Sequence, residues 1–376
     1  MGFGGLSRFG KLRLGASGGA GGGLPYDVDT GLLDFENMTQ AQLQDAFTAF
    51  GITQTRTGTA LRSIDGQAWS EVAENVLGHT TGSTSRPGLF IGNPVTNLCL
   101  YSRDMTNVVW TATNVTPVWS ATGGFNGGGF TTLTATANSG TIAQAITDAS
   151  SQRSAGIWAK RKTGTGRVWL SQNNGSTETE ITLGSTISLT KLAAATLANP
   201  TVRLRFETSS DEIEVYNVNA ARGDCIVDPV ITTSATVARN GELCRKMYGA
   251  DITDFSISIS LNLGDCQSLG YYFALNDSEG NVSPMIGLRR LSGNIQLYRD
   301  AGSGATTANV IASFTPNSDH VIDFEAGASY TRARADGGAW QTLGAIPSGI
   351  RQVIVGSLGN TATANSIIYK VEGIPL

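Results

Sequence analysis

The sequence has little charge, few histidines and no long apolar run. Charged residues make up 15% of the 376 residues, two residues are histidine, and the formal net charge is −4. A nucleic-acid-binding protein carries a basic stripe, so this balance argues against nucleic acid as a partner. No run of about 18 apolar residues occurs, which argues against membrane insertion. Glycines interrupt the N-terminal stretch, so it lacks the apolar centre of a secretory signal peptide.

The shortage of histidine limits catalysis. A Ser-His-Asp triad could use only His79 or His320 as its base, and neither lies in a nucleophile-elbow context. Carboxylates at 211–214 and 323–325 could form glycosidase pairs, because residues two apart in a strand share a face. Solvent-facing strand positions explain most such pairs. We therefore expect no enzyme activity and no catalytic residue.

Cysteine is also scarce, and its spacing argues against a metal site. None of the four cysteines forms a CxxC pair or has a histidine close by in sequence, so no zinc site is predicted. Acidic residues between 26 and 36 lack EF-hand spacing, and the glycine-rich stretches lack the Lys-Ser/Thr of a phosphate-binding loop. We expect neither metal nor cofactor. Buried thiols are favoured, with a disulfide left open, for Cys99, Cys225, Cys244 and Cys266.

Glycine and short apolar runs are abundant. The chain contains 47 glycines and 40% hydrophobic residues, a composition typical of short strands joined by polar turns. Its length predicts two or three domains. We predict an all-β protein with two antiparallel β-sandwiches. The expected divisions are a Gly-rich docking arm at 1–30, a connector with a short helix and a hairpin at 31–87, and sandwiches at 88–248 and 249–376.

The first 24 residues cannot build a core of their own, because glycine dominates them. They are either a disordered tail or an arm that docks into a groove of an acidic partner, and we expect docking. The residues that would dock are the apolar and basic ones: Phe3, Leu6, Arg8, Phe9, Lys11, Leu12, Arg13 and Leu14.

One helix is predicted, over 39–50. Thr39 and Gln42 have capping-box spacing, and Gly51 suits the C-terminal cap. Its apolar face carries Leu43, Phe47 and Phe50. A helix this short must pack on something, either within its own domain or at a subunit contact.

Residues 88–110, GLFIGNPVTNLCLYSRDMTNVVW, hold two apolar runs around a turn signal. The runs at 89–91 and 98–101 predict two short strands separated by a tight reversal, which we interpret as the start of the first sandwich. Later runs suit antiparallel strands at 131–136, 155–159, 168–170, 181–183, 202–206 and 213–217. Trp110, Trp158 and Trp169 lie in or beside apolar strands and are predicted to be core residues.

Residues 249–376 show the same alternation. The segment DFSISISLNL places residues 255, 257, 259 and 261 on one face. YTRARADGGAW predicts a hairpin around residues 336–338, as Asp65-Gly66 does earlier in the chain.

The pattern GLxIxxxxTNLxxYSxDxxxxxW in 88–110 resembles the N-terminal edge of the carbohydrate-binding-module-like jelly rolls in bacteriophage and prophage tail-fibre and virion-appendage proteins. The similarity continues in SAGIWAKRKTGTGRVWLS and ARGDCIVDPVITTSATVARNGELC. The strand order of 249–376 resembles concanavalin-A-like, laminin-G-type sandwiches of phage appendages. Family members usually carry a hydrophobic-acidic pair before TNL, where this chain has Gly92-Asn93, so no role is transferred to that position.

This resemblance implies a non-enzymatic virion protein, a tail fibre, spike or head fibre, made in the host cytoplasm and released by lysis. Its implied partners are further copies of the chain, most often in a trimer, other virion proteins at the N-terminal arm, and a host cell-surface glycan. The alternatives are a structural decoration protein without a ligand and a polysaccharide depolymerase.

Sugar binding requires exposed aromatic faces with polar groups beside them. Two stretches of the second sandwich offer this combination, and packing in the core is the competing interpretation for their aromatic residues. The predicted glycan-binding residues are Tyr298, Arg299, Asp300, Asp336 and Trp340.

Overall fold

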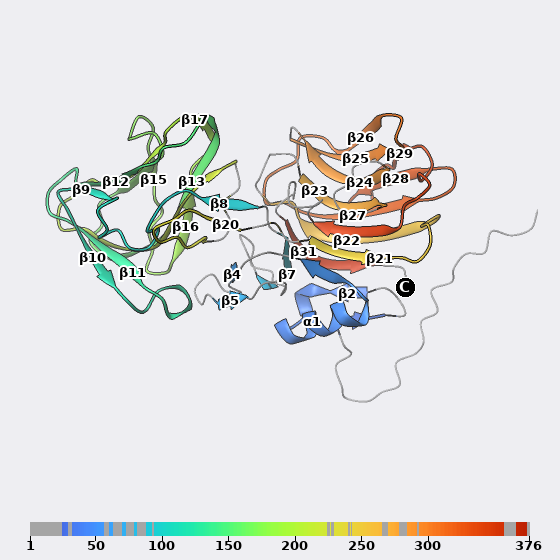
Figure 1. Cartoon of the computed structure of the whole chain (residues 1–376), viewed down its shortest axis with the longest axis horizontal. Coiled ribbons are helices and arrows are strands. Elements are labelled where there is room, and N and C mark those ends of the chain that lie inside the picture. The colour runs from blue at the N-terminus through green and yellow to red at the C-terminus, as the bar shows by residue number, and fades with distance from the viewer. Residues whose placement is uncertain are drawn as a thin grey trace, which may run out of the picture.

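The structure is a computed structural model that describes residues 25–28, 32–55, 60–62, 70–72, 79–80, 88–91, 94–223, 226, 229–239, 241, 243–264, 270–277, 284–291, 293–356 and 366–373. The predicted all-β fold is confirmed, because antiparallel strands form two β-sandwiches that lie side by side (Figure 1). The docking residues predicted between 3 and 14 lie outside the described residues, as do Cys225 and Cys266. Cys99 and Cys244 are both buried.

The first sandwich covers residues 94–239. One of its sheets joins β10 (Val115–Ser120), β11 (Phe130–Ala135), β19 (Glu212–Arg222), β13 (Ser151–Thr163) and β16 (Ser188–Lys191), with β8 (Val95–Asn97), β17 (Ala195–Leu197) and β20 (Val237–Arg239) attached. The other joins β15 (Thr179–Glu180), β14 (Val168–Ser171), β18 (Thr201–Phe206), β12 (Thr141–Ala145) and β9 (Thr111–Thr113). A short 3-10 helix, η2 (Phe125–Gly127), precedes β11. Leu133, Ile157, Leu170 and Leu204 are fully buried between the two sheets.

The second sandwich also has two sheets. The first joins β1 (Tyr26–Asp27), β2 (Leu32–Asp34), β31 (Ser366–Glu372), β22 (Phe255–Asn262), β27 (Asp319–Ala326), β28 (Thr331–Ala335) and β29 (Gln341–Leu343), with β6 (His79–Thr80) and β7 (Gly88–Ile91) attached. The second joins β26 (Ala305–Ile311), β25 (Asn294–Asp300), β24 (Met285–Leu291), β23 (Gly270–Asn276), β30 (Gln352–Gly356), β21 (Leu243–Met247) and β3 (Thr53–Thr55). The predicted alternation in β22 is confirmed, since its four large apolar side chains are buried.

Two hairpins predicted from Asp-Gly turns are confirmed by strand pairing. β4 (Ala60–Arg62) and β5 (Ser70–Val72) pair antiparallel on either side of Asp65-Gly66. β28 and β29 pair on either side of the 336–338 turn, where Asp336 and Gly337 have φ values of 52° and 71°. An Asp and a Gly suit these left-handed positions, because both tolerate positive φ better than most residues.

The predicted helix is confirmed as α1 (Gln40–Ala49), which follows the 3-10 helix η1 (Phe35–Asn37). Thr39 is its N-cap, and the capping box with Gln42 is formed. The three residues of its apolar face are 0–2% exposed and belong to the core of the second sandwich. Of the two alternatives for its partner, the structure therefore shows packing within its own domain, where α1 lies below β2 in Figure 1.

The chain crosses between the sandwiches at 91–95. β7 pairs with β31 of the second sandwich, whereas β8 pairs with β19 and β20 of the first. The reversal predicted there is wrong, because the two strands do not pair with each other, and 98–101 is not a strand. The turn signal between the two runs did not specify their pairing partners, which lie in distant parts of the sequence.

The first sandwich is therefore an insertion within the second. β21 brings the chain back, since it pairs with β30 and β3. Residues 94–239 are called the inserted sandwich below, and the described residues of 26–91 and 243–372 the parent sandwich. This pairing differs from the predicted divisions, which gave 31–87 to a connector and 88–248 to one domain. β8 and β20 lie side by side, so the two ends of the insertion meet, as domain insertion requires.

Candidate functional site

The outer face of the sheet β15-β14-β18-β12-β9 carries a tryptophan among charged side chains. Along β14, Val168 and Leu170 point into the core and are fully buried, whereas Trp169 points the other way and is half-buried. The prediction that Trp169 is a core residue is therefore wrong, although it is confirmed for Trp110 and Trp158. The apolar run suggested burial, but the period of two along a strand places alternate residues on opposite faces.

Two guanidinium groups lie at the Trp169 ring. The Cζ atoms of Arg167 and Arg205 are 5.2 and 5.4 Å from the ring centroid, within the range of a cation-π contact. Arg205 is the direct cross-strand neighbour of Trp169 on β18, and Glu180 is its neighbour on β15. The ring and its flanking charges are therefore fixed by strand register.

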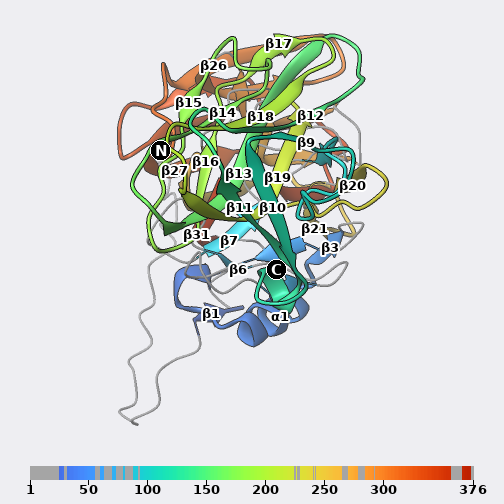
Figure 2. The same ribbon diagram turned by 90° about the vertical axis from the view of Figure 1, so that its left-hand side faces the viewer.

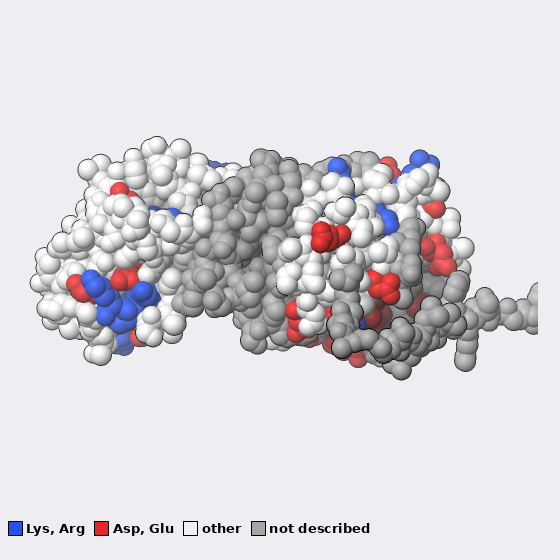
Figure 3. All heavy atoms as spheres, turned by 90° about the horizontal axis from the view of Figure 1, so that it is seen from below, with Lys and Arg blue, Asp and Glu red and all other residues white. Residues whose placement is uncertain are grey.

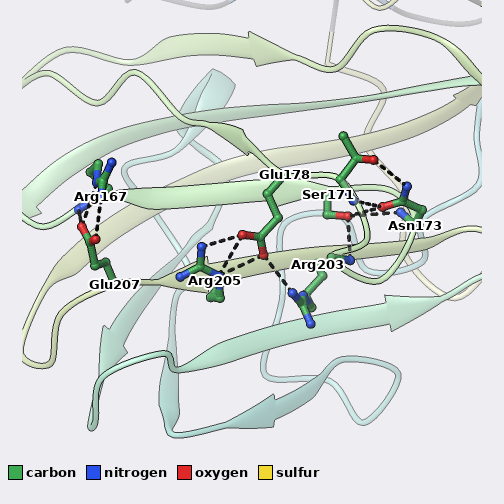
Figure 4. A network of polar contacts seen from close by, with 9 residues as sticks. Arg167, Ser171, Asn173, Glu178, Arg203, Arg205 and Glu207 are labelled. Carbon is green, nitrogen blue, oxygen red and sulfur yellow. Dashed lines mark hydrogen bonds and ion pairs between the residues drawn. The ribbon is translucent and has the colours of Figure 1, made fainter.

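Each of these arginines is held by a carboxylate (Figure 4). Glu207 accepts hydrogen bonds from Nε and Nη2 of Arg167, at 2.9 and 2.7 Å. Glu178 accepts from Nε of Arg205 at 2.9 Å and from Nη2 of Arg203 at 2.8 Å. Paired bonds to one carboxylate hold a guanidinium in one plane, so this network fixes the orientation of the donors.

The network also stabilises the charged forms of these groups. The hydrogen bond from Arg167 lowers the pKa of Glu207 to about 2, and that from Arg205 lowers the pKa of Glu178. In return, Glu207 raises the pKa of Arg167, and Glu178 raises that of Arg205. All four groups are therefore charged at neutral and mildly acidic pH.

A tight loop positions Glu178. The Ser171 hydroxyl oxygen accepts hydrogen bonds from the N–H groups of Gly175 at 2.8 Å and Asn173 at 3.2 Å. The side-chain oxygen of Asn173 accepts from the Thr177 N–H at 2.9 Å. These bonds close the turn between β14 and β15, where Glu178 follows and meets the arginines of β18 (Figure 4).

Small residues extend the face on the other side of the arginines. Thr141 and Ala143 of β12 are the cross-strand neighbours of Arg205 and Arg203, and Thr113 and Thr111 of β9 come next. Both threonines of β9 are exposed. A sugar ring could lie here, with its CH face on an aromatic ring and its hydroxyls on oriented guanidinium and carboxylate groups.

We call the surface that the tryptophan and its charged neighbours form the Trp169 face. Its residues are Arg167, Trp169, Glu178, Arg203, Arg205 and Glu207.

Charged side chains are unevenly distributed over the face of the inserted sandwich that Figure 3 shows. Seen from below, Lys and Arg side chains gather with Asp and Glu on the inserted sandwich, and most of its surface in that view carries no charge (Figure 3). Figure 2 looks along the same sandwich from its free end, where β14, β18 and β12 run next to one another.

The predicted residues on β25 do not form one site. Tyr298 is 6% exposed; Arg289 lies 4.3 Å from its ring centroid and Tyr271 packs edge-on against it. Its hydroxyl donates to Asp300 at 3.3 Å. Arg299 points to the opposite face and donates from Nε to the carbonyl oxygen of Ala345 at 2.6 Å. Tyr298 therefore offers no open ring face to a sugar. The competing interpretation, packing in the core, describes this residue.

Trp340 lies elsewhere, on the outer face of the sheet that contains β28. Its ring centroid is 4.4 Å from the Cζ atom of Arg332 and 4.6 Å from that of Arg334. The structure therefore brings Trp340 together with arginines that the sequence did not single out. Cross-strand neighbours could have identified them, because the predicted hairpin places Arg334 and Trp340 on adjacent strands.

Asp336 is engaged in a brace between two turns. His320 Nδ1 lies 2.6 Å from Asp336 Oδ2, and His320 Nε2 lies 2.9 Å from Ser318 Oγ. The series Ser318, His320 and Asp336 resembles a catalytic triad. The Ser318 hydroxyl, however, has a closer acceptor in the Thr315 carbonyl oxygen, at 2.6 Å, than in His320. Asp336 also accepts from the Val321 N–H at 2.9 Å. We interpret these contacts as structural.

The two carboxylate groups considered for catalysis are paired with basic residues. In both groups, the carboxylates on the strands face cations on a neighbouring strand. The pairs are Glu212 with Lys162 at 3.5 Å, Glu214 with Lys160 at 2.9 Å, Asp323 with Arg334 at 2.8 Å and Glu325 with Arg332 at 2.6 Å. Within the described part of the chain, no cluster of three or more metal-ligating side chains occurs, and no helix could span a membrane.

No protein-family model and no curated protein matches the chain. Among solved structures, the CBM40 of Ruminococcus gnavus IT-sialidase bound to alpha2,3 sialyllactose aligns at 16% identity, covering 32% of this chain and 75% of that one, with a TM-score of 0.27. Domains LG4-5 of the mouse laminin alpha1 chain align at 12% identity, with coverage of 62% and 84% and a TM-score of 0.25.

The tandem CBM22-1-CBM22-2 of Paenibacillus barcinonensis Xyn10C aligns at 9% identity, with coverage of 74% and 98% and a TM-score of 0.26. These structures include carbohydrate-binding modules and laminin domains. TM-scores this low carry no argument about the ligand of this chain.

Proposed function

We propose that this protein is a non-enzymatic glycan-binding component of a phage or phage-derived particle, a tail fibre, spike or head fibre. The inserted sandwich binds a host-surface glycan on the Trp169 face. The N-terminal arm attaches the protein to other virion proteins, and the chain acts as a homo-oligomer, most often a trimer. The resemblance of residues 88–110 to phage appendage proteins supports the particle and the oligomer.

The observation that carries glycan binding is the outward-facing Trp169 with two guanidinium groups close to its ring, each held by a carboxylate. Orientation fixed before binding reduces the entropy lost when a ligand is bound. A ladder of surface ion pairs that only stabilised the sheet is the competing interpretation. Exposed ion pairs contribute about 0–1 kcal/mol each, so stability alone gives little reason for such an ordered network around a tryptophan.

A glycan array probed with the full chain tests this function, with Trp169→Ala as the diagnostic variant. Trp119→Ala is the matched control, since Trp119 is 37% exposed on β10 of the other sheet of the same sandwich. We expect Trp169→Ala to lose at least tenfold in affinity for the bound glycan, and Trp119→Ala to retain it. Equal binding by all three proteins would contradict the proposal.

Deletion of residues 2–24 tests the particle role. We expect the truncated protein to keep both sandwiches folded and to be missing from purified particles. Incorporation at the normal copy number would place the attachment elsewhere in the chain. Release of reducing ends from host polysaccharide would instead identify a depolymerase, and a particle protein that binds no glycan would be a decoration protein.

A further inference from the structure

The parent sandwich carries a second tryptophan-arginine face, on the strands β27, β28 and β29. The inward-facing residues Ile322, Phe324 and Ala333 are at most 2% exposed, so the alternate residues of β27 and β28 face outward. These form cross-strand pairs in register, Asp323 with Arg334 and Glu325 with Arg332. Strand geometry therefore gathers two acids and two arginines on one surface.

Each arginine on this surface is held by its acid. Glu325 Oε2 accepts hydrogen bonds from Nε and Nη2 of Arg332, at 2.9 and 2.6 Å. Asp323 accepts from Nε of Arg334 at 2.8 Å and from the Ser258 hydroxyl at 2.9 Å. The four charged side chains are 27–34% exposed, so they are packed in place and still reach solvent.

Two aromatic rings complete this surface. Trp340 lies against both guanidinium groups, and the Tyr330 ring centroid lies 4.7 Å from the Cζ atom of Arg332. Beyond the acids, the outward positions of β22 are small, with Ser258 and Ser260 beside Asp323 and Val321. On this surface, aromatic rings and guanidinium groups therefore lie next to small serine side chains. On the Trp169 face, the arginines likewise lie next to small threonine and alanine side chains.

We propose that this surface, defined by Asp323, Glu325, Tyr330, Arg332, Arg334 and Trp340 and called the Trp340 face, is a second glycan-binding site. The proposal takes its class of ligand from the proposed function, but its residues belong to the other sandwich. Two arginines and two acids leave the face with no net charge, so its ligand is a neutral saccharide. The acids accept hydrogen bonds from sugar hydroxyls, and they would repel the carboxylates of an acidic polysaccharide.

Two such faces on one chain make the protein bivalent toward a long polysaccharide. The second binding event is then intramolecular, and linked sites raise overall affinity by about 10²–10⁴-fold when both can engage. A short oligosaccharide fills each face separately. A variant that lacks one face therefore binds fewer short oligosaccharides per chain, whereas it binds a long polysaccharide with lower overall affinity.

The test uses the full chain with soluble oligosaccharides of glucose, xylose, mannose and galactose, and with the corresponding immobilised polysaccharides. Alginate oligosaccharides are the acidic comparison. Calorimetry of wild type, Trp340→Ala, Trp169→Ala, the double variant and the Trp119→Ala control gives the stoichiometry. We expect Trp340→Ala to halve the number of oligosaccharides bound per chain and to weaken retention on the polysaccharide by about 10²-fold or more.

Unchanged stoichiometry and retention in Trp340→Ala would overturn the inference, as would binding of alginate alone. If Trp340→Ala reduces binding while Trp169→Ala does not, the Trp340 face is a glycan site and the Trp169 face is not. If Trp169→Ala reduces binding while Trp340→Ala does not, the Trp169 face is a glycan site and the Trp340 face is not. Arg332→Lys is the second variant if Trp340→Ala unfolds. It keeps the charge but loses the planar guanidinium group that contacts both Tyr330 and Trp340, so it is expected to reduce binding as well.

Discussion

At the residue scale, the Trp169 face depends on a glycine. Gly175 has a φ of +86°, and a Cβ atom placed on it would lie 1.7 Å from Nη2 of Arg203. The backbone conformation therefore favours glycine, and an added Cβ would displace the guanidinium of Arg203. The close approach allows Arg203 to reach Glu178 and brings the loop between β14 and β15 against β18.

Gly175→Ala is expected to displace Arg203 and weaken glycan binding, and to lower the free energy of unfolding by about 1–2 kcal/mol through the strained φ. Gly127→Ala is the matched control, because Gly127 has a φ of +71° in the same sandwich but no atom within 4 Å of its added Cβ. Urea unfolding and glycan binding are measured for both. Equal loss of glycan binding in the two variants would contradict a specific role for Gly175.

The pH dependence of the Trp169 face follows from Glu207. Its pKa is lowered from an ordinary 4.5 to about 2, chiefly by the hydrogen bond from Arg167. A lowered pKa means that the contribution of this pair is complete above pH 4.5 and is lost as the pH falls through about 2. An NMR titration of the Glu207 side-chain carboxyl is expected to show a midpoint well below 4.5. In Arg167→Ala the midpoint should return toward the ordinary value; a midpoint near 4.5 in wild type would contradict the account.

At the scale of elements, local signals predicted local structure and could not predict pairing. The capping box of α1 and the Asp-Gly hairpins depend on residues a few positions apart, so they could be predicted from the sequence. The partners of β7 and β8 depend on β31 and on β19 and β20, which lie far along the chain. For the site, the alternation of Val168 and Trp169 along β14 could have given the outward face, but the apolar run led to the wrong prediction that Trp169 is buried. The meeting of Arg167 with Glu207 depends on the register between β14 and β18, which local sequence does not give.

The role of α1 is testable through Phe47, which is 2% exposed and lies 6.1 Å from the Phe35 ring. Phe47→Ala removes a large side chain from the parent core and is expected to cost about 3–5 kcal/mol in the free energy of unfolding. Limited proteolysis followed by mass spectrometry should show cleavage within the parent sandwich, with 94–239 protected. Loss of protection in both sandwiches at once would show that the inserted sandwich depends on the parent.

At the scale of the whole molecule, the insertion explains how two similar architectures share one chain. Each sandwich has its own buried cluster, and the residues of α1, β2 and β7 belong to the parent cluster although they precede the insertion. The chain thus enters and leaves the inserted sandwich through neighbouring strands. This arrangement ties the Trp169 face to the parent sandwich at two points rather than one.

The insertion predicts which fragments fold. A fragment of residues 94–239 contains all of the inserted core and the paired strands β8 and β20, so it is expected to unfold cooperatively and to bind glycan. A fragment of residues 243–376 lacks Leu33, Phe47 and Leu89, which are part of the parent core, and is expected not to fold. Circular dichroism and thermal unfolding of both fragments check this. A folded 243–376 fragment would contradict the insertion.

The most direct test of glycan binding at the Trp169 face is an NMR titration of the tryptophan indole N–H signals with a saccharide that the full chain binds. Assignment uses the single tryptophan variants. The signal of Trp169 is expected to shift on binding, whereas those of the buried Trp110 and Trp158 stay in place. A bound saccharide that leaves the Trp169 signal unmoved would contradict the assignment of this face as a glycan site.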